Sequence, residues 1–232
     1  MMGLVSCNYL TSFYKSYLQL IYLSHVSIAG VRYNLAMKTI IFDLSDVLVK
    51  GLEGVESSLA TYLKIPIEQV FNQLFQFDYR EFWLSQISED ELFARLIAKY
   101  DWNISPKKLK TIVYANFREI SGTRKLISEL KLSYTLILLS VNPREWAEYF
   151  EEKFNYENLF DYVHYSYEIG YTKREPQSFL FILEKYQLDP KDVLLIDDST
   201  RNMNVARSVG IDGIKFISAT QMRNELQLRE LI

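Results

Sequence analysis

Polar and charged side chains stand directly after several short apolar runs of the sequence. Asp43 follows the run 39–42, Ser140 follows 134–139, and Asp197 and Asp198 follow 193–196. Lys173 lies shortly after a further run, 162–166. Carboxylate oxygens are the ligands that Mg²⁺ prefers, while Lys and Ser side chains hold phosphoryl oxygens. Brought together, these residues would make a site for a hard cation and a phosphate group.

The elements that must position these side chains are predicted strands. Continuous apolar runs that stop at polar residues are typical of buried parallel strands, and 213–217 is a weaker run of this kind. Helical patterns lie between the runs, and Gly210 closes a helix that starts near Thr200. The pattern predicts an α/β fold with a doubly wound parallel sheet. In such a sheet ligands bind at the carboxyl ends of the strands, so the polar residues are expected to meet at one edge.

Residues 54–118 carry helical patterns only. The expected helices cover 57–63, 67–75, 89–100 and 106–117, with Ser88 and Ser105 as helix starts. We therefore expect a helical subdomain inserted after the first strand, with 37–53 and 119–232 forming the core. Its aromatic side chains favour packing inside the subdomain, with the lining of a substrate pocket as the alternative. They are Phe71, Phe75, Phe77, Tyr79, Phe82 and Trp83.

Composition restricts the class of protein. Of 232 residues, 49% are apolar and 24% charged, which excludes a disordered or fibrous chain. Cys7 is the single cysteine, so neither an intramolecular disulfide nor a cysteine-built zinc site can form. The net charge of −3 gives no basic field for nucleic acid or for an anionic membrane. We expect a cytoplasmic protein.

The N-terminal stretch differs from the rest. Residues 1–42 hold no acidic residue, whereas 43–232 hold 29 acidic and 23 basic residues. The apolar run 18–31 is interrupted by polar residues and is short for a membrane span. We interpret 1–36 as an extension that folding does not require, with Met37 as the natural start. A signal or transit segment and a structured appendage remain alternatives.

Four ordered motifs carry a family resemblance. They are Ile-Phe-Asp-Leu-Ser-Asp-Val-Leu-Val at 41–49, Leu-Leu-Ser at 138–140, Gly-Tyr-Thr-Lys-Arg-Glu-Pro at 170–176, and Leu-Ile-Asp-Asp-Ser-Thr-Arg-Asn at 195–202. From Lys38 to about Ile217 the sequence resembles the haloacid dehalogenase (HAD) superfamily of hydrolases. The resemblance implies a Rossmann-like core, with 54–118 as the helical cap of that family. Segments 81–83 and 87–92 look like the subgroup containing the phosphatase domain of soluble epoxide hydrolase.

The resemblance also implies roles for individual residues. Asp43 matches the nucleophile that forms an aspartyl-phosphate, and Ser140 and Lys173 match the pair that holds the transferring phosphoryl group. The implied metal site binds Mg²⁺. Its residues are Asp43, Asp198 and the Ser45 backbone carbonyl as ligands, with Asp197 and Asn202 as supporting groups beside the metal.

Three positions depart from the family pattern. Ser45 stands where the family has the aspartate that acts as general acid and base, and Asp46 offers a carboxylate one residue later. Val141 replaces the usual Asn of the subgroup, for which Asn142 is a candidate compensation in substrate binding. Arg174 replaces the usual Pro, which is expected to loosen the loop that carries Lys173.

The function that this pattern favours is that of a Mg²⁺-dependent phosphatase of small phosphorylated metabolites. The alternative is a HAD-fold protein of impaired catalysis that binds or regulates a partner, for which Ser45 and Val141 are the argument. The retained carboxylates and Lys173 argue against that alternative. A dehalogenase, which needs no Mg²⁺, is disfavoured because the Asp197–Asp198 pair is intact.

Overall fold

The computed structural model describes residues 38–232. The predicted extension 1–36, its proposed start at Met37, and Cys7 lie outside the described residues. Within the part that is described, every helix is too short or too polar to cross a membrane.

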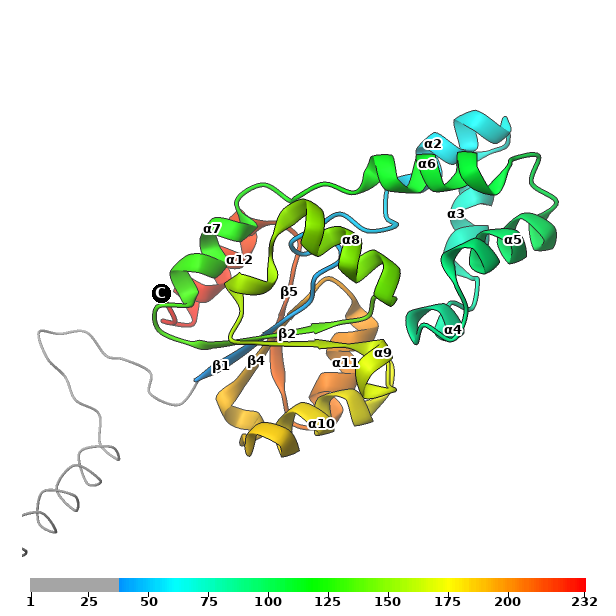
Figure 1. Cartoon of the computed structure of the whole chain (residues 1–232). Helices are drawn as coiled ribbons and strands as arrows, with labels where there is room; N and C mark the ends of the chain where they lie inside the picture. Colours follow the sequence, from blue (N-terminus) through cyan, green and yellow to red (C-terminus); the bar gives the residue numbers. More distant parts are fainter. Residues whose placement is uncertain (1–37) are drawn as a thin grey trace, which may run out of the picture.

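The core is a five-stranded parallel sheet in the order β3-β2-β1-β4-β5 (Figure 1). The strands are β1 (Thr39–Phe42), β2 (Thr135–Ser140), β3 (Tyr162–Tyr165), β4 (Val193–Asp197) and β5 (Asp212–Lys215). All five occur where the sequence predicts them, and the doubly wound α/β fold is confirmed. β1 lies at the centre, between β2 and β4, so the chain order reverses on either side of it. That switch point is where an open parallel sheet binds its ligands.

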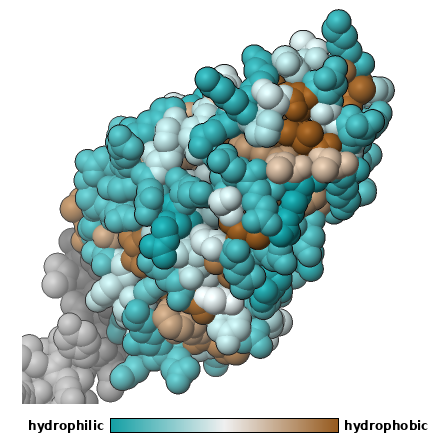
Figure 2. Space-filling view, turned by 45° about the vertical axis from the view of Figure 1, so that its right-hand side comes forward, coloured by the Kyte–Doolittle hydropathy of each residue, from teal (hydrophilic) through white to brown (hydrophobic). Residues whose placement is uncertain are grey.

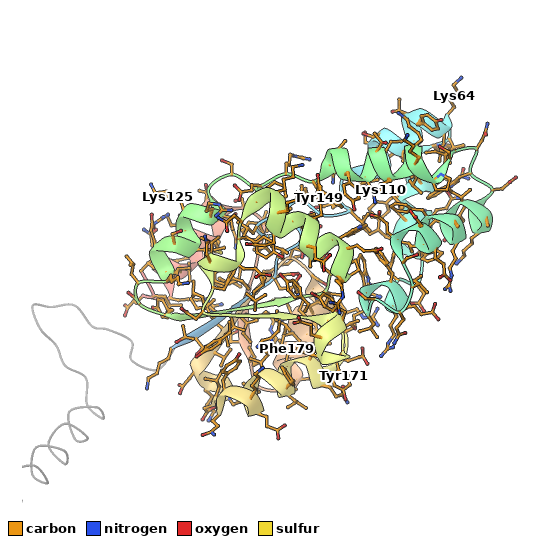
Figure 3. The ribbon with its side chains drawn as sticks, viewed as in Figure 1. Lys64, Lys110, Lys125, Tyr149, Tyr171 and Phe179 are labelled. Atoms are coloured by element: carbon orange, nitrogen blue, oxygen red, sulfur yellow. The ribbon has the colours of Figure 1, made fainter. Side chains whose placement is uncertain are left out.

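Successive strand residues point to opposite faces of the sheet, which builds two apolar layers. Ile40 and Phe42 pack on one face, whereas Ile41 packs on the other. The first face is covered by α7 (Thr123–Leu130), α8 (Arg144–Phe154) and α12 (Ala219–Leu228). The second is covered by α10 (Pro176–Tyr186) and α11 (Thr200–Ser208), with the short α9 (Ser166–Ile169) after β3. Phe179 of α10, labelled in Figure 3, is fully buried in this second layer. Burial on both faces explains why the strands read as continuous apolar runs.

A group of helices between β1 and α7 stands away from the sheet (Figure 1). They are α2 (Val55–Leu63), α3 (Ile67–Phe75), α4 (Arg80–Trp83), α5 (Glu89–Tyr100) and α6 (Pro106–Asn116). The Ser88 and Ser105 hydroxyls accept from the backbone N–H groups of Glu91 and Lys108, as expected of helix N-caps. The sequence did not predict α4, whose four residues are too few for a periodic pattern. We call α2–α6 the cap helices.

Buried and charged contacts join the cap helices to the core. Glu89 at the start of α5 accepts from the Trp146 indole N–H of α8, and its backbone N–H donates to Glu145 over 2.9 Å. Arg80 of α4 is paired with Glu175 over 3.0 Å. Figure 3 places Lys110 on α6 and Tyr149 on α8, at the side where cap helices and core approach each other. The cap helices are thereby held over the carboxyl ends of the strands.

One helix of the cap has an exposed apolar face. Figure 2 shows brown, apolar atoms gathered at the cap end of the molecule. Ile67, Phe71 and Phe75 of α3 are each more than two-fifths exposed, and they follow one another at four-residue spacing along one helix face.

Candidate active site

The parallel pairing of β1 with β4 sets the predicted carboxylates side by side. Phe42 is in register with Ile196, and the Asp43 backbone N–H donates to the Ile196 carbonyl over 2.9 Å. Each strand therefore delivers its next residue to the same edge. Carboxylate oxygens of Asp43, Asp197 and Asp198 all lie within 4.8 Å of one another, a grouping suited to a metal ion.

Lys173 lies in the middle of this cluster. Its ammonium is 2.6 Å from Asp43 Oδ2 and 2.6 Å from Asp197 Oδ2, and the side chain is only 1% exposed. Burial by itself lowers the pKa of Lys173, but the two carboxylates outweigh it and raise the pKa above its ordinary value. Lys173 is therefore a fixed positive charge at the edge of the sheet.

Asp197 and Asp198 are adjacent in sequence but differ in their surroundings. Asp197 is fully buried, and its two oxygens accept from Lys173, from the Ser199 backbone N–H over 2.8 Å, and from the Asn202 amide over 3.1 and 3.2 Å. Asp198 is half-buried and accepts from no other side chain in residues 38–232. Asp197 is thus occupied in holding Lys173 and Asn202, whereas the Asp198 carboxylate is free to bind a cation.

The acidic cluster has more negative charge than Lys173 neutralises. Burial raises the pKa of Asp43 well above its usual range despite the lysine, with Asp197 and Asp198 adding to the effect. Burial, together with Asp197 and Asp46, raises the pKa of Asp198 to about 7. A divalent cation would relieve this repulsion, and carboxylate oxygens are the donor set that Mg²⁺ requires. The residues present therefore fit a Mg²⁺ ion.

Ser140, Asn142 and Ser45 form a hydrogen-bonded chain beside the carboxylates. The Asn142 amide donates to Ser140 Oγ over 2.7 Å and to Ser45 Oγ over 3.0 Å. Ser140 and Asn142 are almost fully buried. Asn142, at the position that the sequence offered as compensation for Val141, thus lies in the site and fixes both hydroxyls.

Asp46 lies in the wall of the same cavity. Its backbone adopts a left-handed conformation with φ of 58°, which Asp tolerates better than most residues. Its Oδ1 is 3.0 Å from the Lys50 ammonium and accepts from the Gly51 backbone N–H over 3.3 Å. Burial raises the pKa of Asp46 in spite of Lys50. The turn that displaces this carboxylate by one residue therefore still leaves it at the site.

The loop that carries Lys173 is closed by its own hydrogen bonds. The Glu175 N–H donates to the Thr172 carbonyl over 3.0 Å, and the Glu175 carboxylate accepts from the Thr172 N–H and hydroxyl. Arg80 also pairs with Glu175. The loosening expected from Arg174 in place of Pro is opposed by these contacts, because Glu175 ties the loop to itself and to α4.

A cavity of about 260 Å³ opens onto this edge of the sheet, between the core and the cap helices. Its polar wall includes Ser45, Asp46, Asp198, Ser199, Asn202, Thr172 and Arg174. Its aromatic wall is Phe75, Tyr79 and Trp83 from the cap side and Trp146 from α8. Tyr79 is only 6% exposed, and its hydroxyl has no hydrogen-bond partner among the described residues. The cavity is large enough for a small molecule only.

The structure brings together all the site residues that the sequence predicted. It adds five cavity-lining residues that the sequence analysis did not single out as parts of the site: Gly51, Leu52, Trp146, Thr172 and Ser199. Of the six aromatic cap residues named from the sequence, Phe75, Tyr79 and Trp83 line the cavity, whereas Phe82 is fully buried. No local pattern distinguishes these two groups. Arg174 also lines the cavity, and its departure from the family motif was the only feature of the sequence that drew attention to it.

Comparison with known proteins places this chain in a family. A family model described as haloacid dehalogenase-like hydrolase matches residues 40–216, which is most of the chain. The chain belongs to the haloacid dehalogenase-like hydrolases. The resemblance seen in the four motifs is therefore confirmed, and a hydrolase is the class of enzyme that the family supports.

Curated relatives of this HAD-like hydrolase include phosphatases. It is 25% identical to the D-ribitol-5-phosphate phosphatase of Bacteroides thetaiotaomicron over 202 residues, covering 82% of this chain and 97% of the relative. It is 22% identical to flavin mononucleotide hydrolase 1 of Arabidopsis thaliana over 188 residues, covering 81% of this chain and 75% of the relative.

Solved structures share the fold. A HAD family enzyme of Bacteroides thetaiotaomicron, in complex with magnesium and inorganic phosphate, superimposes with a TM-score of 0.63 at 22% identity, covering 78% of this chain and 95% of that one. A HAD-like hydrolase of Porphyromonas gingivalis gives a TM-score of 0.66 at 18% identity, covering 84% of this chain and 98% of that one. Mg²⁺, the cofactor predicted here, is thus the metal bound in a structural neighbour.

Proposed function

We propose that this HAD-like hydrolase is a Mg²⁺-dependent phosphatase of small phosphorylated metabolites that acts through an aspartyl-phosphate. The observation that carries the proposal is the buried cluster in which Lys173 lies 2.6 Å from both Asp43 and Asp197, with Asp198 beside them at the cavity. Phosphoryl transfer asks a protein mainly to position the groups and to stabilise charge, and this cluster offers a nucleophile, a fixed cation and a metal site.

Asp43 is the proposed nucleophile. Its Oδ1 accepts from the Leu44 N–H over 2.7 Å and its Oδ2 from Lys173, so the carboxylate is held in one orientation. Attack on phosphorus forms the Asp43–phosphate bond and breaks the bond to the alcohol oxygen, which must receive a proton. Water then attacks the phosphorus of the aspartyl-phosphate, which releases inorganic phosphate and regenerates the Asp43 carboxylate.

Asp43, Asp198 and the Ser45 carbonyl are the proposed Mg²⁺ ligands. When bound, Mg²⁺ would neutralise charge on the phosphoryl oxygens. Asp197 is proposed to support this site by positioning Lys173 and Asn202, because its own oxygens already accept four hydrogen bonds. Lys173 and Ser140 hold the phosphoryl group, and Asn142 orients Ser140 and contributes to substrate binding.

Ser45 is a poor general acid because its hydroxyl gives up a proton with difficulty. Asp46 is the proposed substitute, supported by its place in the cavity wall next to Ser45. General acid catalysis typically contributes about 10²–10⁴-fold to a rate. The enzyme is therefore expected to favour aryl and acyl phosphates, whose leaving groups need no proton, over alkyl phosphates.

Phosphate release from matched aryl and alkyl phosphates, with and without Mg²⁺, tests this proposal. Asp43→Asn should abolish turnover, and Ser45→Asp should raise turnover on alkyl phosphates more than on aryl phosphates. Asp46→Asn should reduce turnover on alkyl phosphates. Asp101→Asn is the matched control, because Asp101 is also left-handed, with φ of 50°, but is exposed at the end of α5. Turnover that does not depend on Mg²⁺ or on Asp43 would refute the mechanism.

The substrate panel can start from the relatives. Their names give D-ribitol 5-phosphate and flavin mononucleotide as substrates of those proteins. Both compounds are primary phosphate esters of a ribityl chain, so comparing them varies the remainder of the molecule at a constant leaving group. We further propose that 37–53 and 119–232 form the catalytic core and 54–118 the cap, since α2–α6 all fall within 54–118.

The second candidate function is that of a binding or regulatory protein of impaired catalysis. The observation in its favour is that the Ser45 hydroxyl is engaged with Asn142 rather than offering an acid to the cavity. An intact fold that binds phosphate esters with Mg²⁺ but releases no phosphate, even from aryl phosphates, would favour this candidate.

A further inference from the structure

Arg174 is a charged side chain at the catalytic cavity that the proposed chemistry does not use. It is exposed, it lines the cavity, and it follows directly on Lys173 in the loop between α9 and α10. Its two neighbours in sequence are both committed, Lys173 to the carboxylate cluster and Glu175 to Thr172 and Arg80. Arg174 itself has neither an ion pair nor a hydrogen bond within residues 38–232.

This lack of a partner distinguishes Arg174 from most arginines of the described chain. Those that form ion pairs are Arg80, Arg95, Arg124, Arg223 and Arg229. Arg201, near the start of α11, resembles Arg174 in having no acidic partner in the described part. The Arg174 and Arg201 guanidinium groups stand near each other at the same edge of the sheet, one directly after Lys173 and the other three residues after Asp198.

The electrostatics of this rim favour an anion. The part of the Arg174 side chain that the cavity wall covers is desolvated, and this, followed by the positive charge of Arg201, lowers the pKa of Arg174. Asp78 of the cap side acts in the opposite direction. A guanidinium remains charged through any such shift. The positive charge beside the cavity is thus incompletely neutralised by the protein, in contrast to Lys173, which faces two carboxylates.

We propose that Arg174, assisted by Arg201, binds a second anionic group of the substrate, so that the preferred substrates are phosphate monoesters that also carry a carboxylate or a second phosphate. This inference rests on the proposed phosphatase function, because it places the transferring phosphoryl group at Lys173. The planar guanidinium matches the two oxygens of a carboxylate or phosphate, which a lysine ammonium does not.

The volume of the cavity limits the size of the substrate. The cavity that Arg174 lines has a volume of only about 260 Å³. The phosphate ester and the second anionic group are therefore expected on one small molecule with a short carbon chain.

Two pairs of compounds isolate the second anion from the leaving group. The pairs are 3-phosphoglycerate with glycerol 3-phosphate, and phosphoglycolate with 2-hydroxyethyl phosphate. In each pair the departing group is a primary alkoxide, and a carboxylate in one member replaces a neutral hydroxymethyl in the other. Steady-state kinetics of the full chain with Mg²⁺ should give a KM at least tenfold lower for the carboxylate member, about the contribution of one hydrogen bond to a charged group.

Variants assign that preference to Arg174. Arg174→Gln should reduce the KM ratio of each pair to near one, and Arg174→Lys should restore only part of it. Arg207→Gln is the matched control: Arg207 lies in the last turn of α11, away from the cavity lining, and should leave the ratio unchanged. Calorimetry on proteins that also carry Asp43→Asn measures the binding of the two members of each pair. It reports the preference for the carboxylate member without requiring turnover.

The outcomes separate this inference from the proposed function. Turnover of both members with equal KM, or a preference that survives Arg174→Gln, overturns the inference and leaves the phosphatase proposal standing. Binding of the carboxylate members that depends on Arg174, without any phosphate release, supports the anion site and refutes the phosphatase proposal. If Arg174→Gln weakens both members of each pair equally, Arg174 acts through the loop or through Asp78 of the cap, and the inference is wrong.

Discussion

Replacing Lys173 by Met tests whether this lysine is the counter-charge that makes the carboxylate cluster possible. Met fills a similar volume but carries no charge, so Asp43 and Asp197 would each lose an ion pair of 2.6 Å in a site where the lysine is 1% exposed. Removing one partner of a buried ion pair typically costs about 3–5 kcal/mol. We expect a loss of that size in the free energy of unfolding at pH 8 without Mg²⁺.

The sign of the pH dependence follows from the same cluster. Without Lys173 the pKa of Asp43, which burial already raises, should rise further. The folded state of the variant then binds more protons than the unfolded state between the unfolded and the folded pKa values of Asp43. The stability of Lys173→Met relative to wild type should therefore fall as pH rises through that window, and the loss should be smaller at pH 5.5 than at pH 8. Added Mg²⁺ should recover part of the stability at pH 8.

Urea unfolding followed by circular dichroism measures the effect. Lys131→Met is the control, since Lys131 is one-third exposed and its ammonium bonds the carbonyls of Asn158 and Phe160. That variant should lose less than about 1 kcal/mol. If Lys173→Met does not fold, the double variant Lys173→Met with Asp197→Asn removes one unpaired charge and should be more stable than Lys173→Met alone. A single variant as stable as the control at pH 8 would refute the counter-charge argument.

Three further outcomes are expected. Protons compete with Mg²⁺ for Asp198, whose pKa is raised to about 7, so the Mg²⁺ affinity measured by calorimetry should fall by up to about tenfold per pH unit below that pKa. Asp198→Asn should bind Mg²⁺ weakly at every pH. An equal Mg²⁺ affinity of wild type at pH 6 and pH 8 would contradict this prediction. Burial lowers the pKa of His164 to about 4, so the unfolded state takes up a proton first as pH falls below about 6.5. Between pH 7 and pH 5, wild type should therefore lose about 1–2 kcal/mol more free energy of unfolding than His164→Gln, measured by urea unfolding. Gly213→Ala would place a Cβ 2.7 Å from the Leu195 carbonyl oxygen and 2.5 Å from Met203 Cε, and should lower the free energy of unfolding by about 1–3 kcal/mol. An unchanged urea midpoint would show that β5 can shift to accept the methyl group.

The elements were largely predictable because their signals are local. An apolar run that ends at Asp43 or at Asp197 indicates a buried strand without knowledge of its neighbours, and all five strands lie where such runs occur. Ser88 and Ser105 indicated helix starts because a serine hydroxyl accepts from a backbone N–H three residues further along the same chain. The short helix α4 escaped prediction because four residues show no helical period.

The residue types of the candidate site were also visible in the sequence, through the four motifs and the order in which they occur. Their polar residues follow strands that had to be parallel, and parallel strands place their carboxyl ends together. That rule places Asp43, Asp197 and Asp198 at one edge of the sheet, and the pairing of β1 with β4 brings them within reach of one another. The motif departures at Ser45 and Arg174 were visible in the sequence as well, but not their consequences.

Tertiary structure decided what each of these side chains contacts. Lys173 meets Asp43 and Asp197 from positions more than twenty residues away in sequence, and the pairing depends on how α9, its following loop and β4 pack. Asp46 lies in the cavity wall on a left-handed backbone, which its sequence position did not indicate. Arg174 lines the cavity and forms no ion pair with any acidic side chain of residues 38–232. Local preferences act over a few residues, whereas contacts, burial and unbalanced charge are properties of the whole packed chain, and a sequence pattern does not contain them.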